Sequence, residues 1–505
     1  MANPLYDNLL GQHAGRDTAF LQAPDGAVMT HDAFLRSGAR YANLLCGLGL
    51  VPGDRVAVQI AKSPQALAVY AACAQAGLIL LPLNTAYTPD EVAYFVQDSG
   101  ARVLLCDTAQ EAALRPIAAA NAAMLETLNE DGSGSFARKA AALSENFVTV
   151  DREADDLAAF LYTSGTTGRS KGAMLTQRNL LSNCETLVAA WRFTGDDTLL
   201  HALPIFHTHG LFVATNIALM TGGKMLFLSR FDPETVIDLL PRATAMMGVP
   251  TFYTRLLDDP RLTRDLVGHM RLFISGSAPL LAETHTRFEA RTGHRILERY
   301  GMTETNMNTS NPYEGERRAG TVGFPLPGVE VKITDSTTGE TLPPGEIGGI
   351  EVRGPNVFKG YWRMPEKTAQ ELREDGFFIT GDLGVFDEDG YLTIVGRSKD
   401  LIISGGYNIY PKEIELLLDA QPGVLESAVI GVPHPDFGET VLGLLVAEPD
   451  THPDPQQILR DIAPALARFK HPRKLIVVPE LPRNTMGKVQ KNSLREDYRT
   501  LFLPG

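Results

Sequence analysis

The sequence predicts an α/β protein with a large N-terminal domain, made of two doubly wound subdomains and a small β-barrel, and a small α+β C-terminal domain. Strand and helix patterns alternate through residues 55–107 and again through 224–276. Short strands between Gly, Pro and Asp turns fill about 321–398, and a mixed pattern continues over 399–505. The chain has 505 residues, more than one hydrophobic core usually organises, so several domains are expected.

The first alternation begins with RVAVQI at 55–60, whose apolar and polar residues alternate as in a β-strand. Ser63 and Pro64 then have the residue types of a helix N-cap and first helical position, and Gly77 suits the helix end. The apolar run LILLPL at 78–83 predicts a buried strand.

A second helix is predicted after Thr88, because Glu91 stands three residues later and completes a capping box. Gly100 ends this helix, and ARVLLCD at 101–107 predicts the next strand. The runs KMLFLSRF, ATAMMGV and RLFISG continue such an alternation through 224–276. Alternating strands and helices indicate parallel sheets that are covered on both faces.

The texture of the sequence changes after about residue 320. VEVKITD, GEIGGIEVRG and FDEDGYLTIVG are short strand patterns joined by turns, which predict a small barrel or sandwich over about 321–398. Beyond it, helices are predicted at PKEIELLLDA (411–420) and QQILRDIAPALARF (456–469), with strands at ESAVIGV, VLGLLVA and KLIVV. We therefore expect a large domain over 1–398 and a small domain over 399–505.

Composition excludes several functional classes. With 46 basic and 60 acidic residues the net charge is −14, so no general attraction to nucleic acid is expected. The first residues lack a signal-peptide pattern, and no apolar run reaches the length of a membrane span. Four scattered cysteines without a CxxC pair indicate free thiols in a reducing compartment: Cys46, Cys73, Cys106 and Cys184. We expect a cytoplasmic protein, and leave monomer or homodimer open.

The most distinctive local pattern is YTSGTTGRSKG at 162–172, which follows the apolar run LAAFL. Its three glycines lie among hydroxyl and cationic side chains, and such a loop can wrap phosphate oxygens with amides and hydroxyls. It is not a Walker A loop, because Ser170 stands five residues after Gly165 where a second Gly is required. A flexible surface turn is the alternative interpretation.

This loop resembles the phosphate loop of the adenylate-forming superfamily, which includes acyl-CoA synthetases, luciferases and peptide-synthetase adenylation domains. The chain departs from the family at Ser170, where Pro is usual. Further segments resemble the family's motifs in the family's order, within residues 30 to 490. They are LPIFH at 203–207, SGSAPL at 275–280, YGMTET at 300–305, YW at 361–362, TGD at 380–382, GRSKD at 396–400, GGYNIYP at 405–411 and PRNTMGK at 482–488.

The resemblance implies that a carboxylate attacks the α-phosphorus of ATP, that pyrophosphate leaves, and that the acyl group then passes to CoA. Thr303 would bond a phosphate, and Asp382 would accept from the ribose hydroxyls with help from Arg397. Glu304 and Thr167 would hold Mg²⁺, a hard ion suited to oxygen ligands. The implied nucleotide-binding residues are Thr163, Ser164, Gly165, Thr166, Thr167, Gly168, Lys171, Ser277, Ala278, Glu298, Arg299, Tyr300, Gly301, Met302, Thr303, Asp382 and Arg397.

The resemblance also assigns roles in the C-terminal domain. Lys488 would be the catalytic lysine that touches the acid's carboxylate and the α-phosphate. Lys399 would be the hinge about which a mobile small domain rotates after adenylation. Gly405, Gly406 and Tyr407 would then form the tunnel for the thiol. A solvated lysine and a hairpin turn are the alternative interpretations of Lys488 and of the GGY segment.

The pocket for the acid is expected among His207, Arg255, Ser277, Arg299 and Met302. A monocarboxylate needs no cation beside its tail, whereas a short dicarboxylate does, because a buried unpaired carboxylate is costly. FYTR and LERYGMTETNMNTSNPY resemble malonyl-CoA synthetases, which implies malonate first and methylmalonate next. Arg255 has an alternative interpretation as a solvated residue on a helix face, and His207 as a residue that only braces the pocket.

Three other functions remain open from the sequence. The chain could be a CoA ligase for another short or medium acid, or a stand-alone adenylation enzyme that loads a carrier protein. An amino-acid substrate would need an acidic residue beside its amine, and the pocket segments contain no clear candidate. A nucleotide-binding module without catalysis is the third alternative, although Lys488 and Glu304 are both present.

Overall fold

The computed structural model shows a mixed α/β fold, as the sequence predicts, and the chain divides into two compact units. The first unit is Met1–Glu330 with Val352–Phe378, and the second is Val331–Glu351 with Ile379–Gly505. The domain boundary expected between residues 398 and 399 stays a prediction. The structure describes residues 3–163, 170–335, 338–404, 407–484 and 487–503.

A six-stranded sheet in the first unit has the order β6-β5-β3-β4-β7-β8. Its central strands β3 (Arg55–Gln59), β4 (Ile79–Pro82) and β5 (Val103–Cys106) run parallel, as the strand–helix alternation predicts. At one edge, β7 (Leu157–Thr163) and β8 (Lys171–Thr176) form an antiparallel pair. The remaining strand is β6 (Met124–Thr127).

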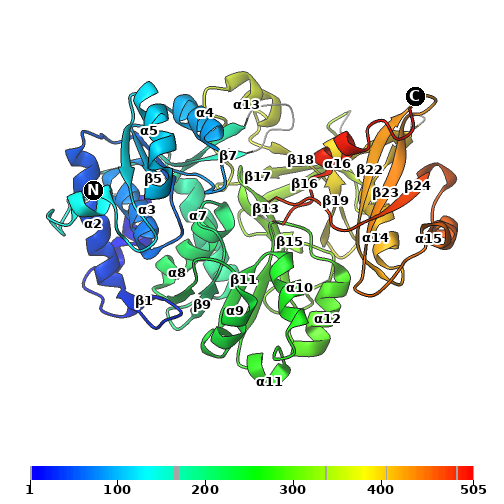
Figure 1. Cartoon of the computed structure of the whole chain (residues 1–505), viewed down its shortest axis with the longest axis horizontal. Helices are drawn as coiled ribbons and strands as arrows, with labels where there is room; N and C mark the ends of the chain where they lie inside the picture. Colours follow the sequence, from blue (N-terminus) through cyan, green and yellow to red (C-terminus); the bar gives the residue numbers. More distant parts are fainter. Residues whose placement is uncertain (1–2, 164–169, 336–337, 405–406, 485–486, 504–505) are drawn as a thin grey trace. The chain divides into compact units, whose positions relative to one another are not determined.

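Two helices of this layer begin and end where the sequence predicts. Ser63 Oγ accepts a hydrogen bond from the Ala66 amide at the start of α3 (Pro64–Ala76). Before α4 (Pro89–Ser99), Thr88 and Glu91 form both bonds of a capping box. These caps satisfy amides that the first helical turn leaves without partners. Figure 1 shows α4 and α5 (Glu111–Ala120) near β5, and the three elements share one buried apolar cluster.

A nine-stranded sheet, also in the first unit, has the order β15-β14-β13-β12-β11-β9-β10-β1-β2. Its bounds are β1 Ala19–Gln22, β2 Val28–Thr30, β9 Thr198–His201, β10 Lys224–Phe227, β11 Ala245–Gly248, β12 Leu272–Ser275, β13 Leu297–Met302, β14 Asn306–Ser310 and β15 Phe324–Pro325. Helices α9 (Pro233–Leu239), α10 (Pro250–Asp258) and α12 (Ala282–Thr292) contribute buried Val, Ile, Leu, Tyr and Phe side chains to its core. The acid-binding candidates lie on β13 or follow the carboxyl ends of β9, β11 and β12.

Two further sheets lie largely in the second unit. One has the order β16-β17-β18-β19, with β16 Glu330–Thr334, β17 Gly348–Arg353, β18 Phe378–Phe386 and β19 Leu392–Arg397. The other has the order β21-β20-β23-β22 with β24 beside β23, and comprises β20 Ile402–Ser404, β21 Tyr407–Ile409, β22 Val424–His434, β23 Gly438–Ala447 and β24 Lys474–Val478. Helices α14 (Pro411–Asp419) and α15 (Pro455–Ile462) pack on it with apolar side chains.

One predicted helix is shorter than expected. The sequence predicts a continuous helix over 456–469, but α15 ends at Ile462 and the chain continues as short 3₁₀ turns at Ala463–Ala465 and Arg468–Lys470. Pro464 explains the difference, because proline lacks the amide proton for the next helical bond and its ring clashes with the preceding turn. Among the described residues, no helix has both the length and the apolar character that crossing a bilayer requires.

Candidate active site

The predicted phosphate loop connects β7 to β8. Thr163 and Lys171 are partners in the register of this antiparallel pair, so the loop leaves and re-enters the sheet edge at the same level. Thr163 and Lys171 are the loop's two predicted nucleotide-binding residues that the structure describes. Ser164, Gly165, Thr166, Thr167 and Gly168 lie outside the described residues.

Lys171 lies in a group of charged and aromatic side chains. Its Nζ is 3.4 Å from the nearer carboxylate oxygen of Glu371 and 4.1 Å from the ring centre of Tyr361. Glu371 is the last residue of α13 (Pro365–Glu371), and Lys367 Nζ lies 2.7 Å from it. Burial works against the ionisation of Glu371, but Lys367, Tyr361 and Lys171 hold its pKa below its usual value.

Glu304, the predicted metal-binding carboxylate, is buried beside this group. Tyr361 Oη lies 3.1 Å from Glu304 Oε1 and 2.7 Å from Glu371 Oε2, so one hydroxyl joins two carboxylates. Burial raises the pKa of Glu304, partly opposed by its bond to Tyr361 and by Lys171. In the sequence, Tyr361 stands out only as part of a motif and Glu371 not at all, since nothing in a helical PEKTAQE segment signals a contact with residue 171.

These residues fit a magnesium ion. The side chains gathered here offer oxygen atoms, the hard donors that Mg²⁺ prefers. Within the described part of the chain, no three His, Cys, Asp or Glu side chains cluster as a complete metal site. Mg²⁺ in proteins is usually held by one or two carboxylates and by substrate phosphates, so Glu304 with a bound nucleotide matches that pattern.

A second group of polar side chains surrounds Arg299 on β13. Arg299 is only 4% exposed, and its Nε and Nη2 have no hydrogen-bond partner within the described residues. Its guanidinium covers Gly276, where an added Cβ would stand 2.4 Å from Arg299 Cζ, so a larger residue at 276 would displace the guanidinium. Burial lowers the pKa of Arg299 to about 9, which leaves it a cation at neutral pH.

His209 and Ser277 lie in the same group. Ser277 Oγ is 3.2 Å from His209 Nδ1, and the His209 amide donates to His207 Nδ1 at 3.4 Å. His209 is 1% exposed, and burial together with Arg299 keeps its pKa well below the usual value, so the ring is neutral. Its Nε2 has no partner within the described residues. Unpaired buried polar groups of this kind suit a polar ligand.

The other predicted residues of β13 are spread over different surroundings. Glu298 is buried and its Oε1 lies 3.6 Å from His285 Nδ1 and 3.3 Å from the Gly320 amide. The pairing of β13 with β14 is irregular between Tyr300 and Gly301, and such irregularities re-aim the following side chains. Four predicted residues are partly exposed and keep their roles only as predictions: Ala278, Tyr300, Met302 and Thr303.

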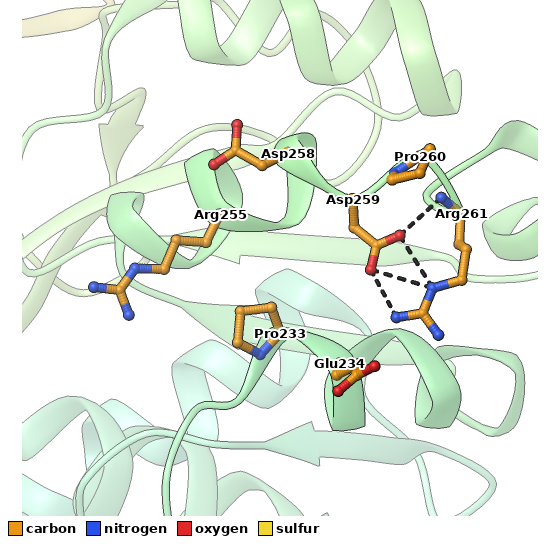
Figure 2. Close-up of a pocket in the computed structure, with 7 residues that line it drawn as sticks. All are labelled: Pro233, Glu234, Arg255, Asp258, Asp259, Pro260 and Arg261. Carbon is orange, nitrogen blue, oxygen red and sulfur yellow. Dashed lines mark hydrogen bonds and ion pairs between the residues drawn. The ribbon is translucent and has the colours of Figure 1, made fainter. Parts of the chain in front are cut away.

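Arg255 differs from Arg299 in that its side chain is exposed. It is exposed on α10, whereas Tyr253, two positions earlier, is fully buried and donates to the Ile274 carbonyl. Two helical positions differ by about 200°, so the two side chains face opposite ways. Figure 2 shows Arg255 directed away from the ion pair of Asp259 and Arg261. The open hollow there measures about 590 Å³ and is lined by Pro233, Glu234, Arg255, Asp258, Asp259, Pro260 and Arg261.

The second unit contains the predicted ribose-binding pair. Asp382 on β18 and Arg397 on β19 are register partners, with Arg397 Nε 3.1 Å from Asp382 Oδ1. Asp382 is buried, and its amide donates to Thr380 Oγ1. Lys399 follows in a 3₁₀ turn, and its pKa is lowered by burial and by Arg397.

The predicted catalytic lysine and the thiol-tunnel tyrosine are both exposed in the second unit. The Lys488 amide donates to Asn484 Oδ1, and the Asn484 amide donates to the Lys488 carbonyl. Tyr407 is 57% exposed and its ring stacks on Phe469 at 4.5 Å between centres. No pattern in the sequence pointed to Phe469. Gly405 and Gly406 lie outside the described residues.

Comparison with known proteins places this arrangement in a family. The family model of AMP-binding enzymes matches residues 10–362, and that of the AMP-binding enzyme C-terminal domain matches 413–488. A feruloyl-CoA synthase of Amycolatopsis sp is 36% identical and a malonate–CoA ligase of Arabidopsis thaliana is 33% identical; the matches cover 94% and 95% of this chain, and 94% and 85% of those proteins.

Among solved structures, ATP-bound MatB of Rhodopseudomonas palustris is 57% identical, covers 99% of this chain and 100% of its own, and has a TM-score of 0.97. The resemblance to adenylate-forming enzymes, first seen in short motifs, is therefore confirmed over almost the whole chain. The chain belongs to the family of AMP-binding enzymes.

Proposed function

We propose that the protein is an acid–CoA ligase that forms malonyl-CoA from malonate, ATP and CoA, and that it accepts methylmalonate next. The observation that carries this proposal is the buried guanidinium of Arg299, whose Nε and Nη2 have no hydrogen-bond partner among the described residues, in the group that also holds His209 and Ser277. The relatives support it, because they include a malonate–CoA ligase at 33% identity. CoA ligases for other acids also match the chain, so the choice of acid rests on the pocket.

In the first half-reaction, a carboxylate oxygen of the acid attacks the α-phosphorus of ATP. The bond to pyrophosphate breaks, and an acyl-adenylate forms. Thr163 and Lys171 would hold phosphate oxygens, and Asp382 with Arg397 would bind the ribose hydroxyls. Glu304 would hold Mg²⁺, which neutralises phosphate charge when bound. Lys488 would stabilise the negative charge that develops between the acid and the α-phosphate.

In the second half-reaction, the CoA sulfur attacks the acyl carbonyl, and the bond to AMP breaks. The products are a thioester and AMP, and the thiol proton is released. Tyr407, with Gly405 and Gly406, would line the tunnel for the thiol. Lys399 would be the hinge about which the small domain rotates between the adenylation step and the thioester-forming step. Two steps with different requirements explain why one small domain carries both Lys488 and Tyr407.

The acid is selected at its distal end. Malonate carries a second carboxylate that takes no part in the reaction, and burying it without a partner would be costly. Arg299 Nε and Nη2 and His209 Nε2 are buried and have no hydrogen-bond partner in the described part of the chain, and the partly buried Ser277 contacts His209. Charge-assisted bonds to such a cation are about twice as strong as neutral ones. An acid with an apolar tail would leave these groups unsatisfied.

Replacing each candidate arginine separately tests the assignment. We expect Arg299→Met to lower kcat/KM for malonate by about 100-fold, because a buried charged contact contributes roughly 2–5 kcal/mol. The melting temperature should not fall, since Arg299 Nε and Nη2 are buried and form no hydrogen bond with any residue that the structure describes. Arg255→Leu should retain malonate activity within about threefold, as expected for an exposed side chain.

If Arg255→Leu abolished malonate activity and Arg299→Met did not, Arg255 would be the residue that binds the distal carboxylate. If the enzyme were specific for ferulate or acetate and neither substitution changed its kinetics, malonate would not be the substrate. The ligase reaction would still stand. Pyrophosphate exchange that depends on an amino acid instead would favour the stand-alone adenylation enzyme.

A further inference from the structure

Glu371 places a carboxylate against the lysine that we assign to the nucleotide's phosphates. Lys171 Nζ lies 3.4 Å from each oxygen of Glu371, and both side chains are largely withdrawn from solvent, at 12% and 21% exposure. The Tyr361 ring lies 4.1 Å from the same ammonium. The positive charge of Lys171 is therefore balanced by an anion of the chain itself.

Two further contacts fix this carboxylate. Lys367, one helical turn earlier on α13, lies 2.7 Å from Glu371 Oε1, and Tyr361 Oη lies 2.7 Å from Glu371 Oε2. The same hydroxyl reaches Glu304 Oε1 at 3.1 Å. Glu371 is thus held between two lysines and is linked through Tyr361 to the carboxylate that would hold Mg²⁺.

We propose that Glu371 is an internal counter-ion that occupies Lys171 until a nucleotide phosphate replaces it. The inference rests on the proposed function, because it assumes that Lys171 binds phosphate. A phosphate that approaches Lys171 meets the negative charge of Glu371 at the same ammonium, and two like charges at that spacing repel each other. Glu371 therefore weakens the binding of a bare polyphosphate, and makes tight binding depend on a divalent cation that offsets the extra charge.

The proposed role of Glu371 predicts an effect on nucleotide affinity that a purely structural role does not. Removing a residue that merely supports the fold weakens binding, whereas removing a competing anion tightens it. The two lysines on Glu371 also act in opposite directions. Lys367 attracts the Glu371 carboxylate toward α13. Without Lys367, Glu371 would pair more strongly with Lys171, and phosphate would bind more weakly.

The test is calorimetric titration of the full-length protein with ATP, and separately with inorganic pyrophosphate, in the presence of EDTA. We expect Glu371→Gln to lower the metal-free Kd by about fivefold, which corresponds to an ion pair of about 1 kcal/mol. Lys367→Met should raise it. Glu366→Gln is the matched control, because it removes the same charge from an exposed position of the same helix and should leave the Kd unchanged.

A double-substitution cycle locates the effect. In a Lys171→Met background, Glu371→Gln should no longer tighten binding, because the competition for that ammonium is gone. A Glu371→Gln protein with an unchanged melting temperature and an equal or higher metal-free Kd would overturn the proposal. So would Lys367→Met binding at least as tightly as the wild type. Failure of the wild type to bind ATP even with Mg²⁺ would instead contradict the proposed function itself.

Discussion

Arg299 and Arg255 illustrate how far single residues can be interpreted without a fold. Both are arginines near motifs of the acid pocket, and the sequence cannot tell which is buried, because burial depends on the layers that surround each strand and helix. The structure leaves Arg255 exposed and buries Arg299, two of whose nitrogens have no hydrogen-bond partner among the residues described. Buried groups with strongly altered titration cluster at functional sites, so Arg299 carries the stronger argument.

Lys488 provides the clearest prediction at the scale of one residue. Lys488→Ala should lose adenylation by several kcal/mol, because a charge that forms in the transition state loses its stabilising cation. Folding should be normal, since Lys488 is exposed. Malonate-dependent exchange of pyrophosphate into ATP measures the first half-reaction alone. Exchange close to the wild-type rate would remove Lys488 from the mechanism.

Local chemistry determined many of the helices and strands, and these could be predicted. Ser63 and the Thr88–Glu91 box begin helices where their side chains can satisfy orphan amides, and Gly77 and Gly100 end those helices with positive φ angles of 70° and 62°. Such signals act within a few residues and need no tertiary context. Pro464 is a local signal too, and it ends α15 at Ile462, before the end that the apolar pattern over 456–469 predicts.

Contacts between distant elements could not be predicted. Tyr361 joins Glu304 to Glu371 only because the segment after β17 returns to the six-stranded sheet, where Tyr361 bridges to Ala173 on β8. No periodicity or spacing in a sequence indicates contacts between residues that are so far apart along the chain. The group around Arg299 and His209 forms likewise because β9 and β13 belong to one sheet: His209 follows the carboxyl end of β9, and Arg299 lies on β13.

The packing of α2 (His31–Gly47) predicts a pH dependence of stability. His31 is 1% exposed beside His13, at 4.6 Å between ring centres, and burial first, then His13 and Arg16, lower its pKa from 6.5 to about 4. In the unfolded chain His31 is protonated below about pH 6.5, whereas in the folded chain it is protonated only below about pH 4. The free energy of unfolding should fall by up to about 3 kcal/mol as the pH falls across this window.

Urea denaturation at a series of pH values measures that slope. His31→Gln should flatten it, whereas the exposed His452→Gln should leave it unchanged. An identical slope in wild type and His31→Gln would show that other groups cause the acid sensitivity.

At the scale of the whole molecule, the proposed machinery is divided between the two units. Lys171, Glu304 and Arg299 belong to the first unit, and Asp382 and Lys488 belong to the second. Neither unit alone contains both the acid-binding group and the catalytic lysine. The proposed residue roles therefore require both units, and the second must serve two successive steps if Lys399 acts as a hinge.

Restricting the backbone at Lys399 should separate these steps. Proline fixes φ and removes a donor, so Lys399→Pro should slow thioester formation by about 100-fold while pyrophosphate exchange stays within about threefold. Quenched-flow measurement of adenylate and thioester resolves the two rates. Equal losses in both steps would argue against a hinge at this residue.

The most direct test of the account is the acid preference of the wild-type protein. CoA-dependent release of AMP from ATP should be measured with malonate, methylmalonate, acetate, octanoate and ferulate as the acid. The buried cation predicts that kcat/KM for malonate, followed by methylmalonate, exceeds that for each monocarboxylate by about 100-fold or more. A value for acetate, octanoate or ferulate equal to or above that for malonate would contradict it.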